Sequence, residues 1–212
     1  MTSSTLDRLP DGGRVIIIGG GPGATACALG LQRLASQLGR RIRITLVEGK
    51  QFAGERHYNQ CAGVLAPLLA DVLQEQLDVS FPYHLSRGKI PGDVLHAAGQ
   101  EICLKDTAQP AVALRRVQFD AYMLETAVQR GIHLLAARAV DLEFHADCVT
   151  VYTESAPLEG DVLVGAFGSV YERANIPDIL FYGAPQPRVA RSQFLMVSFL
   201  TNGTSAIRLF LP

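Results

Sequence analysis

The sequence of 212 residues contains no tryptophan, and only 7% of its residues are aromatic and 18% are charged. Soluble domains average about 25% charged residues, whereas here hydrophobic residues reach 48% and the formal net charge is only -1. This composition excludes a disordered chain, which combines low hydrophobicity with high net charge. It also argues against a nucleic-acid partner, because nucleic-acid-binding domains carry a strongly basic surface.

The chain has only four cysteines, Cys27, Cys61, Cys103 and Cys148, and no two of them form a Cys-x-x-Cys pair. Its five histidines form no His-x-x-x-His pair. A disulfide-stabilised secreted scaffold would be shorter and richer in cysteine, and a zinc site would need ligands at short spacings. We therefore expect reduced thiols, a cytoplasmic location and no metal site.

The first thirteen residues lack the apolar segment of a signal peptide, so we expect none. Residues 15–32 contain no charge and are long enough to resemble a membrane span. Gly19–Gly23, however, places four glycines and a proline in the middle of this run, which would break a spanning helix. The run predicts a strand, a turn and a buried helix, with no transmembrane segment. Peripheral contact with a membrane stays open.

The start of the chain predicts a βαβ unit. Arg14–Ile18 is a β-branched run typical of a strand buried on both faces, and Pro22 suits the first position of a helix. Apolar residues then recur at helical spacing up to Gly39, and Ile42–Val47 predicts a second strand. Two strands joined by a helix imply a parallel sheet with a right-handed crossover. The fold class is therefore α/β, with a Rossmann-type parallel sheet.

The rest of the chain predicts further elements of both kinds. We expect helices over residues 65–77 and 119–131, a loop over 78–92, hairpins over 94–105 and 140–153, and strands over 132–135, 162–164, 194–200 and 206–211. The domains expected are a lead-in over residues 1–13, a nucleotide-binding domain over 14–170 with an inserted hairpin region at about 78–112, and an antiparallel substrate-side sheet that begins over 171–212. Because the chain stops after an apolar run, we expect this last domain to be incomplete.

The turn Gly19-Gly20-Gly21-Pro22-Gly23-Ala24 carries the strongest chemical signal. In a dinucleotide-binding motif the first glycine permits the tight turn, the second lets the backbone approach a pyrophosphate, and a small residue at the third position lets the helix pack closely. The helix N-terminus then presents free N–H groups to the phosphates. Glu48 ends the second strand and can accept hydrogen bonds from an adenosine ribose, which favours FAD or NAD over NADP. The motif alone does not choose between FAD and NAD.

Two segments resemble flavoproteins of the para-hydroxybenzoate hydroxylase superfamily. They are the run Val15–Ala24 and the stretch Arg116-x-x-Phe119-Asp120-x-x-Met123-x-x-x-Ala127-x-x-x-Gly131, and the second is especially like the geranylgeranyl reductase branch. The resemblance implies FAD as the cofactor and a flavin contact for Arg116. A surface arginine is the alternative, and Arg115 is an equally placed competitor.

Two further segments carry the same resemblance. Asn59–Gly63 resembles the Cys-Gly-Gly segment of the reductase branch, near the flavin, so Cys61 is a candidate catalytic residue. A buried, inert cysteine is an equally weighted alternative, and His57 and Tyr58 are candidate proton donors. Gly160–Ser169 resembles the Asp-Gly fingerprint of the superfamily, and Gly165 and Gly168 would form its turn. Phe167 stands where that fingerprint has an aspartate, so a polar contact to the cofactor is lost there.

The resemblance implies an FAD-dependent oxidoreductase that reduces a carbon–carbon double bond of an apolar, prenyl-like small molecule. The electron donor would be NAD(P)H or a redox protein. A flavin-dependent aromatic monooxygenase is the second reading, against which Phe167 counts. A truncated or degenerate nucleotide-binding module without activity is the third, and Phe167 and the early end of the chain favour it.

Overall fold

The computed structural model describes residues 9–51, 61–97, 99–105 and 109–166. The chain divides into two compact units, residues 1–50 with 127–212 and residues 51–126. The two units are described separately below. The predicted strands over 194–200 and 206–211 lie outside the described residues, as do Phe167 and Gly168.

A four-stranded parallel sheet forms the centre of the first unit. Its strands lie in the order β12 (Val162–Gly165), β1 (Gly13–Ile18), β2 (Ile42–Val47) and β8 (His133–Leu135). Every neighbouring pair is parallel, and Ile18 stands opposite both Val47 and Gly165 in the register. The predicted Rossmann-type sheet is therefore confirmed, and the carboxyl ends of its strands meet at one edge.

Helix α1 (Pro22–Gln37) connects β1 to β2 and contacts both strands. It begins at Pro22, as predicted. The N–H of the first helical residue has no partner inside the helix, so proline loses no hydrogen bond at this position. Ala24, Ala28 and Leu29 are almost wholly buried, so the helix packs closely on the sheet. Gly39 follows the last turn with φ of 63°, a left-handed conformation that glycine adopts without strain.

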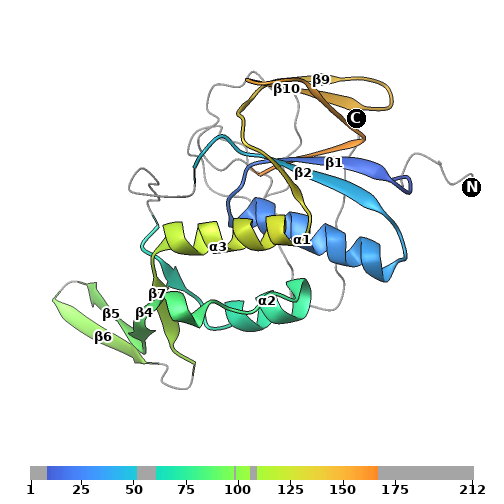
Figure 1. Ribbon diagram of the computed structural model, residues 1–212. Coiled ribbons are helices and arrows are strands. Elements are labelled where there is room, and N and C mark those ends of the chain that lie inside the picture. Colours follow the sequence, from blue (N-terminus) through green and yellow to red (C-terminus); the bar gives the residue numbers. More distant parts are fainter. Residues whose placement is uncertain (1–8, 52–60, 98, 106–108, 167–212) are drawn as a thin grey trace, which may run out of the picture. The chain divides into compact units, whose positions relative to one another are not determined.

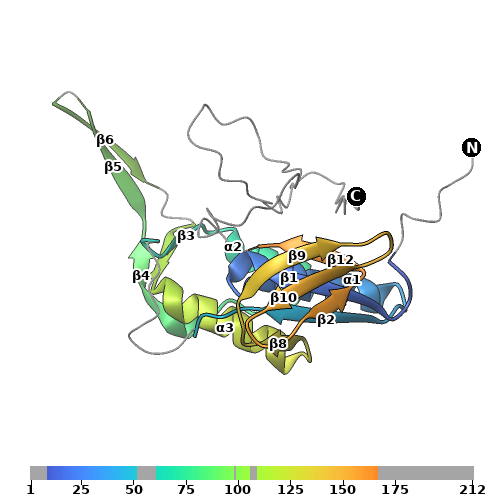
Figure 2. The same cartoon turned by 90° about the horizontal axis from the view of Figure 1, so that it is seen from above.

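An antiparallel sheet covers the face of the parallel sheet opposite α1 (Figures 1 and 2). It consists of β9 (Ala139–Phe144), β10 (Val149–Thr153) and β11 (Leu158–Gly160), in the order β11-β10-β9. Ile16 and Ile18 of β1 and Val151 of β10 are buried in one apolar cluster between the two sheets. This cluster positions β1, and with it the turn that follows β1.

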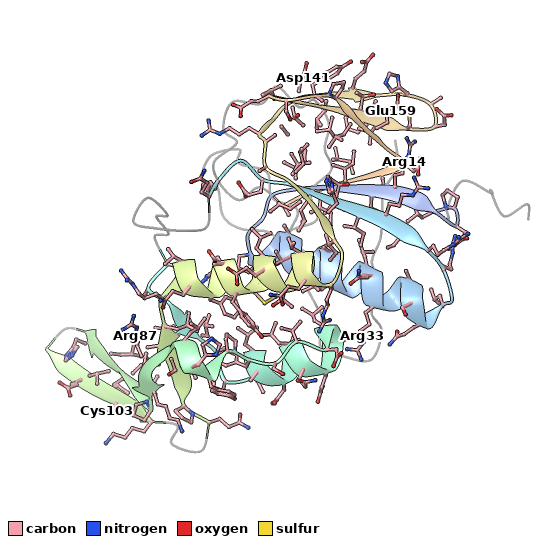
Figure 3. All side chains as sticks on the ribbon, in the orientation of Figure 1. Arg14, Arg33, Arg87, Cys103, Asp141 and Glu159 are labelled. Atoms are coloured by element: carbon pink, nitrogen blue, oxygen red, sulfur yellow. The ribbon has the colours of Figure 1, made fainter. Side chains whose placement is uncertain are left out.

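Arg14 of β1 joins the parallel sheet to β11 and to Asp161, the residue between β11 and β12. Its Nη2 lies 2.8 Å from Oδ1 of Asp161, and its backbone N–H donates to Oδ2 of the same carboxylate. Its Nη1 lies 3.4 Å from Oε2 of Glu159 (Figure 3). The hydrogen bonds from Arg14 lower the pKa of Asp161. Asp161, directly before β12, thus has a structural role.

The described part of the second unit combines a three-stranded antiparallel sheet, a hairpin and three helical segments. The sheet has the order β3 (Val64–Leu65), β7 (Ala111–Leu114), β4 (Ser86–Ile90), and the hairpin pairs β5 (Gly92–Ala97) with β6 (Gln100–Lys105). Helix α2 (Leu69–Leu77) is followed by the short 3-10 helix η2 (Tyr83–Leu85), and α3 (Arg116–Gln129) begins directly after β7. The core of this unit includes Leu73, Val79, Phe81, Phe119 and Met123, all buried.

Two predictions for this unit were wrong in detail. The helix expected over residues 65–77 begins only at Leu69, because Val64 and Leu65 pair with β7 as a short strand. The loop expected over 78–92 contains β4, which pairs with β7 through a bulge near Gly88. The hairpin around residue 99 and the helix that ends before Gly131 are confirmed.

Candidate functional site

The turn between β1 and α1 is built from glycine at the position where the backbone requires it. Gly19 has φ of 123°, which side-chain-bearing residues rarely adopt. Its N–H donates to the carbonyl of Val47 at 2.8 Å, which ties the turn to the end of β2. Thr25 is fully buried, and its hydroxyl donates to the carbonyl oxygens of Gly21 and Pro22 at 3.1 and 3.2 Å. These contacts hold the first turn of α1.

Within the described residues, neither Gly21 nor Gly23 has a structural need for glycine. Gly21 precedes the helix with φ of -71° and ψ of 177°, extended values that other residues adopt. A Cβ atom at either position would meet no atom of the residues that the structure describes within 4 Å. Gly21 also supplies no side-chain cap, and the first N–H groups of a helix lack partners inside the helix. A group that accepts hydrogen bonds can therefore approach the backbone at Gly21 closely, as a pyrophosphate does in this motif.

Glu48 lies against the glycine turn. Its Oε2 accepts a hydrogen bond from the N–H of Gly20 at 2.8 Å, and its Oε1 accepts one from the N–H of Lys50 at 2.7 Å. Its own N–H donates to the carbonyl of Leu135 at the end of β8. The carboxylate is thus fixed at the edge where β1, β2 and β8 end, which is the position expected for a ribose acceptor.

Gly165 is the last residue of β12 and stands beside Ile18, directly before the glycine turn. The following N–H, that of Ala166, donates to the carbonyl of Ile18 at 2.9 Å. The first glycine of the predicted Asp-Gly fingerprint is therefore at the same edge of the sheet as Gly19 and Glu48. Its second glycine, Gly168, is outside the described residues.

In the second unit the structure brings together three polar residues around the start of α3. Nη1 of Arg116 lies 3.3 Å from the sulfur of Cys61, and its Nε lies 3.1 Å from Oδ1 of Asp120, one turn further along α3. Asp120 is 3% exposed, whereas Cys61 is exposed. The sequence named Cys61 and Arg116 separately, and the structure makes them neighbours. The sequence indicated no role for Asp120, although the spacing of four residues between Arg116 and Asp120 is that of a helical ion pair.

The environment of Cys61 differs from that of the other cysteines. The pKa of the Cys61 thiol is lowered, chiefly because the backbone N–H of Gly63 donates to the sulfur and also because Arg116 does. Burial raises the pKa of Cys27 to about 11. The pKa of Cys148 is also raised, by desolvation and by the nearby carboxylate of Asp147. The alternative of a buried, inert residue therefore fits Cys27 but not Cys61.

Gly63 fixes the backbone beside Cys61. It has φ of 79°, and its carbonyl accepts a hydrogen bond from the N–H of Leu114, the last residue of β7, at 2.9 Å. A Cβ atom at Gly63 would collide with the carbonyl oxygen of Leu114. The chain from Cys61 into β3 therefore approaches β7 as closely as glycine alone permits, just before Arg116.

We expect Gly63→Ala to lower the free energy of unfolding by about 2 kcal/mol or more, since left-handed backbone alone costs about 1–2 kcal/mol and the collision adds to it. Gly131→Ala is the matched control, because Gly131 has φ of 84° and an added Cβ would meet nothing within 4 Å. Chemical denaturation followed by circular dichroism measures both. Equal losses in the two variants would show that the close approach at Gly63 contributes nothing.

For the remaining candidate site residues, the described part of the structure shows no contact that supports a role. Arg115, the competitor of Arg116, is exposed at the start of α3. His57 and Tyr58 lie outside the described residues. In the part of the chain that the structure describes, no group of three or more histidine, cysteine, aspartate or glutamate side chains is placed to hold a metal ion. No helix of the described residues is long and apolar enough to cross a membrane.

Residues 13–195 match a family model described as pyridine nucleotide-disulphide oxidoreductase. No curated protein matches the chain. Among solved structures, a variant of the halogenase PltM in complex with FAD has a TM-score of 0.58 and 19% identity over 76% of this chain and 35% of that chain. The peptidyl tryptophan dihydroxylase QhpG has a TM-score of 0.55 and 21% identity, covering 74% and 32%.

The flavin-dependent brominase Bmp2 is similar at a TM-score of 0.55 and 19% identity, covering 72% of this chain and 37% of its own. The chain thus spans about a third of the length of these solved proteins. At such low identity these likenesses concern the fold, and they agree with the parallel sheet described above.

Proposed function

The chain belongs to the pyridine nucleotide-disulphide oxidoreductase family, and on this premise we propose that it is the cofactor-binding part of an FAD-dependent oxidoreductase. Membership confirms the predicted oxidoreductase class. FAD, the predicted cofactor, is also the cofactor in the complex of the PltM variant, with which the chain shares its fold. Because the chain spans about a third of such proteins, activity and substrate remain proposals for the whole protein.

The observation that carries the proposal is the glycine at position 21. Neither its backbone angles nor its neighbours among the described residues require glycine there. Glycine before a helix also increases the conformational entropy lost on folding. A cofactor whose pyrophosphate approaches this backbone gives a reason for the residue, and Gly19, Glu48 and the N-terminus of α1 lie around the same position.

We assign the remaining contacts as follows. The N–H groups of Gly23 and Ala24 face the pyrophosphate from the first turn of α1, and Glu48 accepts from the adenosine ribose. Gly165 closes the site from the end of β12, and Gly168 is a further cofactor contact that the resemblance implies. When bound, FAD supplies hydride transfer. Arg116 contacts the flavin, as the resemblance implies, and Cys61 is the candidate catalytic residue beside it.

For the substrate we propose a small apolar molecule with a carbon–carbon double bond, as in geranylgeranyl reductases. The support is the resemblance over Arg116–Gly131 and over the segment that ends at Gly63. The electron donor would be NAD(P)H or a redox protein. The protein residues would orient the alkene and exclude water from the flavin side.

A second candidate is a flavin-dependent monooxygenase acting on an aromatic ring. One observation favours it, namely the likeness of fold to the tryptophan dihydroxylase QhpG and to the halogenases. Turnover separates the two candidates. Oxidation of NADH or NADPH with release of hydrogen peroxide favours the monooxygenase, and saturation of a prenyl alkene favours the reductase.

The FAD assignment is tested first by reconstituting the purified protein with FAD. We expect the purified chain, incubated with FAD and dialysed, to stay yellow and to retain about one FAD per chain, measured by absorbance after denaturation. A chain that is colourless after the same treatment would contradict the FAD assignment. That result would instead favour the degenerate nucleotide-binding module without activity.

A further inference from the structure

Arg138 lies in the short connection between β8 and β9, at the edge of the parallel sheet where Glu48 and the glycine turn are. Its neighbours in the chain, Ala137 and Ala139, are buried, and its carbonyl accepts a hydrogen bond from the N–H of Glu154 at 3.0 Å. The backbone of Arg138 is therefore held in place, while the residue itself is exposed. Among the described residues its guanidinium has no hydrogen-bond or ion-pair partner. The guanidinium is thus available to a ligand.

The stem of Arg138 lies against Gly49, the residue that follows the predicted ribose acceptor Glu48. A Cβ atom at Gly49 would collide with Cγ of Arg138 and would lie 3.2 Å from its backbone nitrogen. Gly49 does not have a positive φ, so its own conformation does not require glycine. The close approach of the arginine therefore gives the reason for glycine at this position.

The strand order places three different groups in a row along this edge. The glycine turn follows β1, Glu48 follows β2 and Arg138 comes after β8, and these three strands lie side by side in that order (Figure 2). Glu48 is joined to both sides, because its carboxylate accepts from the N–H of Gly20 and its own N–H donates to the carbonyl of Leu135. Arg138 is therefore on the side of Glu48 that is away from the glycine turn.

An adenine dinucleotide presents its groups in a matching order. The base is bonded to C1′ of the ribose, next to the carbon that carries the 2′-hydroxyl, and the pyrophosphate is attached through C5′ on the other side of the sugar. With the pyrophosphate at the glycine turn and the ribose at Glu48, the base extends toward the end of β8. Arg138 is the charged side chain that comes after that strand.

We propose that Arg138 recognises the adenine base of the cofactor by stacking its planar guanidinium on the purine ring, and that Gly49 is glycine to leave room for this arginine. Guanidinium groups stack on aromatic faces and on unpaired bases, and they stay protonated. The inference rests on the proposed function, which supplies FAD as the ligand and Glu48 as the ribose acceptor. Arg138 and Gly49 are both outside the segments that resemble known flavoproteins.

An arginine beside an adenosine ribose has a second use, since it can bind the 2′-phosphate of NADP. Glu48 argues against that use, because its carboxylate is fixed at the position of the ribose and would repel a phosphate there. The two uses differ in what the arginine recognises. Stacking depends on the base, whereas the alternative depends on the 2′-phosphate, so ligands that differ in only one of these groups separate them.

The test measures nucleotide binding to the purified full chain by competition with FAD. ADP and UDP carry the same ribose and diphosphate and differ only in the base. Arg138→Met keeps an unbranched stem beside Gly49 and removes the guanidinium. We expect it to raise the dissociation constant of ADP by about threefold to tenfold, as for the loss of a cation–π contact. That of UDP should rise by less than about twofold, because uracil offers a smaller ring for stacking. Equal losses for ADP and UDP would overturn the base assignment.

Arg43→Met is the matched control for charge. Arg43 is exposed near the start of β2, opposite Arg14 in the register and away from the edge where β2 ends, so its loss removes the same charge elsewhere on the sheet. It should leave both dissociation constants unchanged. Arg138→Lys keeps the charge without the planar group, and we expect it to lose most of the preference for ADP. Full ADP affinity in Arg138→Lys, or equal losses in the two arginine-to-methionine variants, would reduce Arg138 to a general positive charge.

Gly49→Ala tests the reason for the glycine. The added methyl group should push the stem of Arg138 aside and weaken ADP binding by a factor similar to that of Arg138→Met. In an Arg138→Ala background the colliding Cγ is absent, so the same change should cost much less. An equal cost in both backgrounds would show that Gly49 does not act through Arg138. Thermal unfolding of each variant verifies that it is folded.

A last pair of ligands addresses the 2′-phosphate. We expect the wild type to bind adenosine 2′,5′-bisphosphate no more tightly than AMP. A preference for the bisphosphate that disappears in Arg138→Met would overturn the stacking role in favour of phosphate binding. Failure of the proposed function gives a different result, because a wild-type chain that binds neither FAD nor ADP contradicts the cofactor site itself. Normal ADP binding by Arg138→Met contradicts only the role of Arg138.

Discussion

Gly21→Val is expected to abolish the retention of FAD while leaving the protein folded. The added side chain would extend into the space from which the pyrophosphate reaches the backbone N–H groups at the start of α1. Each hydrogen bond to a charged group contributes about 1.5–3 kcal/mol. The loss of two such bonds would weaken binding by about 3 kcal/mol or more, a factor of at least roughly 100.

The fold should tolerate this change, and that makes the result interpretable. Gly21 has extended backbone angles, and an added Cβ meets no atom of the described part of the chain within 4 Å. We therefore expect the unfolding free energy of the cofactor-free variant to stay within about 1 kcal/mol of the wild type. The expected loss is that of replacing glycine at the N-cap by valine, which is a poorer N-cap residue. Fluorescence titration of FAD and thermal unfolding of the same sample measure both quantities.

Gly23→Ala is the matched control two residues away. Gly23 is inside the first turn of α1, where alanine is favoured over glycine by about 0.5–1 kcal/mol, and an added Cβ again meets nothing within 4 Å. We expect this variant to unfold at a temperature about 1–4 °C higher and to bind FAD like the wild type. Normal FAD content in Gly21→Val would contradict the cofactor assignment, whatever the control does.

Much of the first unit was predictable because its signals are local and strong. The β-branched run of β1, the proline at the start of α1 and Gly39 after its end each act within a few residues. The neighbourhood of Glu48 and the glycine turn also follows from the sequence. Adjacent parallel strands end at the same edge, so residues that follow them meet.

The second unit shows what such signals miss. Ser86–Ile90 is a short, largely exposed edge strand without an apolar alternation, and a bulge near Gly88 interrupts its pairing. For α2 the leucine spacing suggested a start at Leu65. Pro67, however, disfavours helix in the residue before it, and the pairing of Leu65 with Val112 takes that residue into a strand.

The contact between Cys61 and Arg116 was also beyond the sequence. The two residues are 55 positions apart, and their contact depends on β3 pairing with β7 directly before α3. Asp120 is different, because its spacing from Arg116 was visible as a helical pair of opposite charges. The sequence did not show that Asp120 is buried. Because it is buried, its carboxylate holds the guanidinium of Arg116 in one position.

Glu48→Ala is expected to raise the dissociation constant for FAD by about tenfold to a hundredfold, since one or two charge-assisted hydrogen bonds of about 1.5 kcal/mol each would be lost. The carboxylate already accepts from the N–H groups of Gly20 and Lys50. Its two oxygens offer about four acceptor positions. Two therefore remain for ribose hydroxyls, and binding need not break the contact that holds the glycine turn.

Glu48→Ala would also weaken FAD binding if its only effect were to loosen the glycine turn. A double-mutant cycle with a modified ligand distinguishes this cause from the loss of a ribose contact. ADP and 2′-deoxy-ADP are measured as competitors of FAD against the wild type and Glu48→Ala. If Glu48 receives the 2′-hydroxyl, deleting that hydroxyl weakens binding to the wild type but makes no difference to the variant. An equal penalty in both proteins would mean that Glu48 acts on the turn alone. The ribose contact would then have to be sought elsewhere at the edge where β1 and β2 end.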